Sequence, residues 1–228
     1  MRSTRRLWRI SPALQLLLIR HATNDWVPDR LAGWTPGVHL NDEGRAQASA
    51  VAQRLTGCRI DAVYASPLER AMETAAFVAM PHDLPVLPLQ GVGELRLGEL
   101  EGRSLKELSQ HPLWGTVQHT PSLVRLPGGE SFTEMQARAV AAIEGLRESH
   151  PRDVVAVVSH GDVIKAILAH YGGLHLDMFQ RLVVEPASIS AVQFTEGPPR
   201  LILLNDTGAV PQPPDRDHGA EPTMASDS

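Results

Sequence analysis

The sequence predicts an α/β fold, a three-layer α/β/α sandwich with a mostly parallel central sheet. Apolar runs at residues 16–19 and 154–158 are typical of strands covered on both faces. So short a run also fits a buried helix, but these runs alternate along the chain with segments of helical periodicity, as in α/β proteins. The chain has 228 residues and 43% hydrophobic content, which is enough for one sizeable core.

The first predicted strand, residues 16–19, ends at Arg20 and His21. In open α/β sheets, ligands bind outside the carboxyl ends of the strands, so these two side chains are placed for chemistry. Taken alone, the stretch is equally consistent with a helix-capping arginine and a structural histidine. A second run, residues 154–158, leads to Ser159 and His160. Two strands of this kind would put both imidazoles at the same edge of one sheet.

A loop and a helix follow the first strand. Residues 24–39 are rich in proline, glycine and tryptophan, which is typical of a loop. Trp26 and Trp34 in this loop either line a crevice or cover the edge of the core. Small and apolar residues then recur at helical spacing over residues 43–55.

The next elements are a strand, a helix and a short strand. We expect a strand over residues 60–64, and a helix that Ser66 and Pro67 open as a cap followed by proline. Arg70 would fall in the first turns of that helix, on the side of the sheet's carboxyl edge. Residues 86–89, bracketed by prolines, predict an edge strand.

The least regular region is predicted to form a lid over the site, about residues 95–130. It is rich in glycine and proline. Four of its side chains are candidates to contact the rest of a substrate, although most are expected to be solvated. They are Arg103, Lys106, Trp114 and Arg125.

The second half of the chain predicts a long helix, a strand and another helix. Residues 131–150 form a helix with a capping box, Ser131 followed three residues later by a glutamate. Arg138 lies on this helix and is free to point either way. A strand over residues 154–159 and a helix over residues 163–170 follow.

The termini frame a single domain, residues 13–206. Its last elements are predicted to be a hairpin of residues 189–194 and 201–204. Residues 1–12 read as a mobile extension, and residues 207–228, rich in proline, aspartate, glycine and serine, as a disordered tail.

Composition limits the classes of function. A net charge of −5 argues against a nucleic-acid binder, so no nucleic-acid partner is expected. No apolar run approaches the roughly 20 residues that cross a bilayer, and the arginines near the N-terminus are not followed by a signal-peptide core. Cys58 is the single cysteine, which suits a reducing compartment, and we expect a cytoplasmic protein.

Five motifs occur in the chain in a fixed order: residues 18–22, 40–48, 64–75, 94–102 and 159–161. Their order and spacing resemble the histidine phosphatase superfamily, also called the phosphoglycerate mutase-like family. The resemblance covers residues 14–204, nearly the whole chain. It implies that family's fold.

The resemblance also implies roles for individual residues. His21 would be the histidine that becomes phosphorylated, and Glu94 the proton donor. Arg20 and Arg70 would bind the phosphate with fork-like pairs of donors, and His160 would add a hydrogen bond or a charge. Nearby arginines disfavour a positive charge on the nucleophile, which must attack as a neutral imidazole.

Two positions depart from the family pattern. Ala22 stands where glycine is commonest, and Val27 stands where many members place an asparagine that helps to hold the phosphate. Asn24 is the nearby residue that would compensate. We expect no metal and no cofactor, because two arginines supply positive charge and would repel the dication of a rival zinc site.

Three functions are compatible with these residues. The first is a metal-independent phosphatase that hydrolyses a small phosphomonoester through a phosphohistidine. The second is a cofactor-dependent phosphoglycerate mutase, which the short interval of 66 positions from Glu94 to His160 disfavours because dedicated mutases of the family tend to carry a longer insertion there. The third is a phosphate-binding protein without catalysis. The substrate stays open, as does the oligomeric state, a homodimer included.

Overall fold

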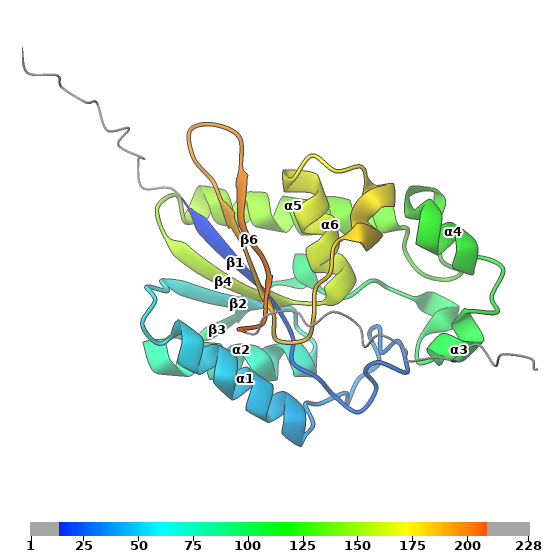
Figure 1. Ribbon diagram of the computed structural model, residues 1–228, viewed down its shortest axis with the longest axis horizontal. Coiled ribbons are helices and arrows are strands. Elements are labelled where there is room, and N and C mark those ends of the chain that lie inside the picture. The colour runs from blue at the N-terminus through cyan, green and yellow to red at the C-terminus, as the bar shows by residue number, and fades with distance from the viewer. Residues whose placement is uncertain (1–13, 209–228) are drawn as a thin grey trace, which may run out of the picture.

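The computed structural model describes residues 14–208 and contains a six-stranded sheet in the order β3-β2-β4-β1-β5-β6 (Figure 1). Strands β3, β2, β4 and β1 run parallel, while β5 and β6 are antiparallel additions at one edge. The sheet is thus mostly parallel, as predicted. The strands are β1 Gln15–Arg20, β2 Ala62–Ala65, β3 Val86–Pro88, β4 Val154–Ser159, β5 Ile189–Gln193 and β6 Arg200–Asp206.

Helices cover both faces of the sheet, which gives the predicted three layers. Helices α1 and α2 lie on one face, and α5 and α6 on the other (Figure 1). The α-helices are α1 Asp42–Leu55, α2 Glu69–Ala79, α3 Leu105–Leu108, α4 Trp114–His119, α5 Phe132–Ser149 and α6 Gly161–Tyr171. Short 3₁₀ helices are η1 Met80–His82, η2 Gln90–Val92, η3 Gly98–Leu100, η4 Pro121–Leu123 and η5 Leu176–Arg181.

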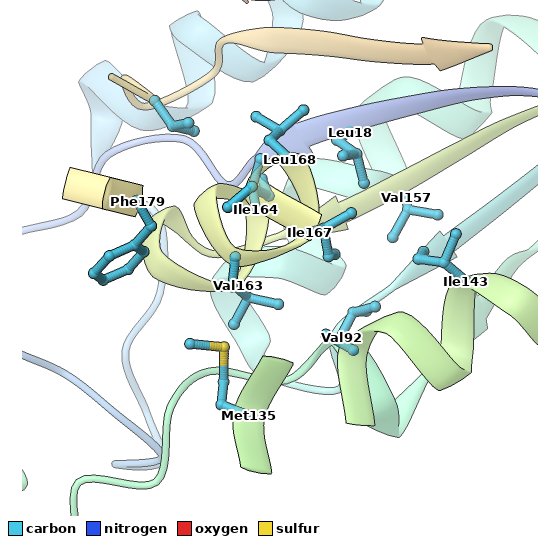
Figure 2. Packing of buried hydrophobic residues seen from close by; sticks show 14 of the residues in the cluster. Leu18, Val92, Met135, Ile143, Val157, Val163, Ile164, Ile167, Leu168 and Phe179 are labelled. Carbon is cyan, nitrogen blue, oxygen red and sulfur yellow. The ribbon is translucent and has the colours of Figure 1, made fainter. Parts of the chain in front are cut away.

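The core is packed on both sides of the sheet because the central strands are apolar on both faces. Leu16, Leu18 and Ile19 of β1 are fully buried. On the α5/α6 side, Ile164 and Ile167 of α6 pack into one cluster with the strands and with α5 (Figure 2). The other face of the sheet packs against the small residues of α1 and α2.

Of the two helix starts with predicted capping residues, one is confirmed and one is wrong. Ser131 and Glu134 form the predicted capping box of α5. Ser66, however, does not cap α2, which begins at Glu69 behind Leu68 with no side-chain cap. The Ser66 hydroxyl instead meets His160.

Some predictions at the ends of the chain can be compared with the structure, and others cannot. The predicted terminal hairpin is present as the antiparallel pair β5 and β6. The predicted extension, residues 1–12, and nearly all of the predicted tail lie outside the described residues. Within residues 14–208, no helix has the length and apolar character needed to span a bilayer.

Two features of the fold position the candidate site. Strands β1 and β4 are parallel neighbours, with Arg20 opposite Ser159, so both strands end at the same level. The lid region, residues 95–130, carries α3 and α4 beyond one end of the sheet (Figure 1). The site therefore forms where the strands end, as expected for open α/β sheets.

Candidate active site

The two histidines of the sequence motifs meet at the carboxyl ends of β1 and β4. The His21 backbone N–H donates to the Ser159 carbonyl at 2.9 Å, which extends the strand pairing by one residue. The ring centroids of His21 and His160 are 5.1 Å apart at an interplanar angle of 62°. Both side chains are buried. The predicted juxtaposition of the two imidazoles is confirmed.

The surroundings of His21 determine which ring nitrogen carries the proton. Nδ1 lies 2.8 Å from the Ala22 carbonyl oxygen, which only accepts, so Nδ1 is protonated and donates. Nε2 is then unprotonated, and its lone pair accepts from Arg70 Nε at 3.3 Å. Burial, followed by the charges of Arg70 and Arg20, holds the pKa of His21 well below its ordinary value. His21 is therefore a neutral imidazole with an available Nε2.

Arg70 links both histidines to the loop that follows β1. It is the second residue of α2 and is 1% exposed. Its Nη2 donates to the Gly33 carbonyl at 2.9 Å and to His160 Nδ1 at 3.2 Å. Gly33 has φ +52°, and a Cβ there would lie 1.9 Å from Glu101 Oε2. Only glycine fits at this position, which presents its carbonyl to Arg70.

His160 is held in the opposite tautomer to His21. Its Nδ1 accepts from Arg70, so its Nε2 carries the proton and donates to Ser66 Oγ at 2.7 Å. Burial and the charge of Arg70 hold the pKa of His160 well below its ordinary value. Its Nδ1 also lies 3.5 Å from Glu94 Oε2. Because His160 is neutral, that contact is not an ion pair.

Buried guanidinium donors remain available for an anion. Arg20 Nη1 donates to the Val184 carbonyl at 2.6 Å, but Arg20 Nε and Arg70 Nη1 are buried without a hydrogen-bond partner in residues 14–208. A Cβ on Gly161 would lie 3.4 Å from Arg20 Nε, so this guanidinium lies against the N-terminus of α6. The helix dipole there also favours negative charge.

Asn24 is buried close to His21 in the chain. Its Oδ1 accepts from the Trp26 backbone N–H at 2.9 Å, and its Nδ2 is another buried donor without a partner in the described part of the chain. Within residues 14–208, no hydrogen bond joins Asn24 to the histidines or arginines of the site. Its role in binding phosphate stays a prediction.

Glu94 lies beside the arginine and histidine pair. Its Oε1 accepts from the Leu95 backbone N–H at 2.9 Å, and its Oε2 is 4.0 Å from Arg70 Nη2. Burial raises the pKa of Glu94 to about 7, with a contribution from the charge of Asp162 and opposition from that of Arg70. Near neutral pH the carboxyl is thus divided between a form that donates a proton and a form that accepts one.

The backbone around Glu94 is held by a partly buried ion pair, which we call the Arg138–Glu130 clamp. Arg138 Nη1 donates to the carbonyls of Gly91 and Gly93, and Nη2 to the carbonyl of Glu94, all at 2.8 Å. Arg138 Nε also donates to Glu130 Oε2 at 3.0 Å. Sequence reasoning left the direction of Arg138 open, and the structure turns it inward.

The clamp also ties together the two ends of the lid. The Arg96 N–H donates to Glu130 Oε1 at 2.9 Å, and the Glu130 N–H donates to the Arg96 carbonyl at 3.0 Å. Trp34 Nε1 donates to the Glu94 carbonyl at 2.6 Å, and Arg96 stacks over the Trp34 ring at 4.0 Å. Trp34 therefore supports the backbone of Glu94 rather than merely covering the core.

Sequence reasoning missed several supporting residues. Ser66 follows β2 at the same sheet edge, and the rule that located the histidines applies to it as well. Thr74 accepts from the Ala22 N–H at 3.0 Å and donates to the Arg70 carbonyl at 2.7 Å, which joins the end of β1 to α2. Glu101 and Glu130 act on backbone N–H groups far away in sequence, and no local pattern indicates such contacts.

The charged candidates in the lid do not reach the histidines. Arg103, Lys106 and Arg125 are exposed. Arg125 pairs with Glu134, and Arg103 Nε donates to the Glu99 carbonyl at 3.3 Å. Trp114 instead lines an apolar cavity under the lid.

Known proteins resemble this chain over most of its length. A model of the histidine phosphatase superfamily (branch 1) matches residues 16–207. Phosphoserine phosphatase 1 of Hydrogenobacter thermophilus is 29% identical over 85% of this chain and 93% of its own. A probable phosphoglycerate mutase of Cronobacter sakazakii is 31% identical over 81% and 87%. The solved structure of Bacillus stearothermophilus YhfR has a TM-score of 0.80 at 28% identity, over 85% and 98%.

Proposed function

Because this chain belongs to the histidine phosphatase superfamily, we propose that it is a phosphatase that hydrolyses a small phosphomonoester through a phosphohistidine on His21. The observation that carries the proposal is the state of His21: neutral, protonated on Nδ1, with Nε2 in contact with Arg70. A ring nitrogen attacks phosphorus with its lone pair, so it must be unprotonated, as Nε2 is here.

The first step forms a bond between His21 Nε2 and phosphorus and breaks the bond from phosphorus to the ester oxygen. Arg20 and Arg70 offer their unpartnered donors to the phosphoryl oxygens, and the N-terminus of α6 adds its dipole. Two guanidinium groups supply the positive charge that this step needs.

Glu94 completes the cycle by moving one proton in each step. Its carboxyl, with a pKa of about 7, gives a proton to the leaving alkoxide. The resulting carboxylate takes a proton from the water that attacks the phosphohistidine. Inorganic phosphate then leaves, and His21 and Glu94 return to their starting protonation states.

A phosphoglycerate mutase is the second candidate, because relatives that share about 31% of their residues carry that name. It would use the same residues but would have to keep water from the phosphohistidine. The short connection between Glu94 and His160 favours the phosphatase.

The test is release of inorganic phosphate from p-nitrophenyl phosphate with EDTA present, for the native protein and His21→Ala. We expect turnover that survives EDTA and is lost in the variant, with acid-labile ³²P-labelling of the native protein alone. Interconversion of phosphoglycerates without phosphate release would favour the mutase. If neither reaction occurs, the proposal is wrong.

A further inference from the structure

An apolar cavity of about 60 Å³ lies under the lid, and we call it the lid chamber. Ten of its twelve lining residues are apolar, among them Leu97, Trp114 and Phe132. The other two are His111 and Asp162. No lysine or arginine is among the lining residues.

The lid chamber adjoins the candidate active site at Glu94. Leu95 lines the chamber, and its backbone N–H donates to the Glu94 carboxylate at 2.9 Å. Asp162, in the first turn of α6, also lines it, and the charge of Asp162 acts on both Arg20 and Glu94. Asp162 also follows Gly161, which packs against Arg20, so the chamber lies beside the phosphate site.

We propose that the lid chamber holds the alcohol part of the substrate, and that this part is a compact, uncharged and largely apolar group such as a short alkyl chain. The inference rests on the proposed function. The leaving oxygen must lie opposite His21 Nε2 and within reach of Glu94. Whatever is attached to that oxygen then points past Glu94 toward Leu95 and the chamber.

The charge of the chamber disfavours carboxylate-bearing substrates. A carboxylate in it would meet Asp162, which lies 3.5 Å from Lys165 Nζ, and would find no lysine or arginine among the lining residues themselves. Phosphoserine and phosphoglycerates carry such a group, so this chain is expected to differ in substrate from the relatives named after them. A cavity of about 60 Å³ is smaller than the ~150 Å³ that takes up benzene, which favours a short chain over a ring.

Binding of phosphonates, which cannot be hydrolysed, tests the chamber without relying on turnover. Isothermal titration calorimetry would give the Kd of methyl-, ethyl-, propyl- and butylphosphonate and of 3-phosphonopropionate. We expect Kd to fall about fourfold with each added methylene that is buried. Since 3-phosphonopropionate carries a carboxylate where propylphosphonate has its terminal methyl, we expect it to bind more than tenfold more weakly.

Two variants and one matched control locate the effect. Val117→Asn puts a polar group of similar size into the wall, and it should flatten the chain-length series while leaving the Kd of methylphosphonate unchanged. Asp162→Asn should strengthen binding of 3-phosphonopropionate at least fivefold. Leu123→Asn changes an exposed residue of the same lid that does not line the chamber, and it should change neither.

The outcomes separate this inference from the proposed function. The inference about the chamber is wrong if Kd does not change along the phosphonate series, or if 3-phosphonopropionate binds more tightly than propylphosphonate. This holds even if p-nitrophenyl phosphate is hydrolysed. If affinity rises along the phosphonate series and Val117→Asn removes this increase, the chamber is confirmed as a binding site. If affinity rises along the series while no phosphoester is hydrolysed, the proposed function alone is wrong.

Discussion

Replacing Glu94 with glutamine should make the protein more stable at high pH, by an amount that the structure sets. The pKa of Glu94 rises from 4.5 to about 7 in the fold. One pH unit corresponds to about 1.4 kcal/mol, so ionising this buried carboxyl in the folded protein costs about 3 kcal/mol as an upper value.

The sign follows from where each state holds the proton. Below about pH 4.5 both states are protonated, and the stabilising contribution of the protonated carboxyl is fully present. As the pH rises toward about 7, the unfolded chain releases its proton while folded Glu94 keeps it, so the native protein loses stability. Glutamine has no proton to release.

Urea unfolding of the native protein and Glu94→Gln at several values between pH 5 and pH 8 measures this effect. The stability of the variant minus that of the native protein should grow by about 2–3 kcal/mol across this range. Glu148→Gln, at an exposed position of α5, controls for exchanging a carboxylate for an amide elsewhere. A difference that does not change with pH would mean that Glu94 ionises normally, and its role as the proton donor at neutral pH would be untenable.

Three further predictions concern the residues around Glu94 and His21. Arg138→Lys loses the planar guanidinium that donates to three carbonyls around Glu94. The kcat for alkyl phosphates, whose leaving group needs a proton, should fall at least tenfold, and the kcat for p-nitrophenyl phosphate should fall less. Equal losses for both substrates would contradict a role of Arg138 in positioning Glu94. Because the pKa of His160 is lowered in the fold, only the unfolded chain protonates this imidazole just below about pH 6.5. The free energy of unfolding of the native protein should therefore fall toward acid more steeply than that of His160→Gln, by about 1 kcal/mol per pH unit. Equal pH dependence of the two proteins would refute the neutral state of His160. Gly33→Ala puts a methyl group against Glu101 and moves the Gly33 carbonyl away from Arg70. The inhibition constant of inorganic phosphate should therefore rise at least fivefold. An unchanged inhibition constant would show that the position of Arg70 does not depend on this loop.

Strands and helices with a clear local pattern of apolar and capping residues were predictable from the sequence. The buried strands, the long helices and the capping box at Ser131 each carry a local pattern that fixes the element. Local pattern and topology together were enough to bring His21 beside His160, because parallel strands end at one edge. Arg70 and Glu94, by contrast, were assigned through the resemblance to the family, because no local pattern marks them.

The remainder depends on contacts between distant side chains and backbone groups. Ser66 has the composition of a helix cap, and only the arrival of His160 from β4 shows that its hydroxyl is used elsewhere. Arg138 and Glu130 grip a backbone segment that precedes them by more than thirty residues. Neither the spacing nor the type of these two residues predicts the contacts, because they form only when α5 packs beside the segment that contains Glu94.

The pairing of Arg96 with Glu130 holds the two ends of the lid together. The two ends of the lid meet at this hydrogen-bonded pair, while the Glu94 carbonyl is fixed on the sheet side by Arg138. Insertions are best tolerated where the two ends of a loop are already held together. Exchanging the segment between residues 106 and 120, which leaves Glu101 and its contact with Trp34 in place, should therefore change which alcohol is accepted without moving Arg70 or Glu94. This is a route by which one scaffold can diversify its substrates.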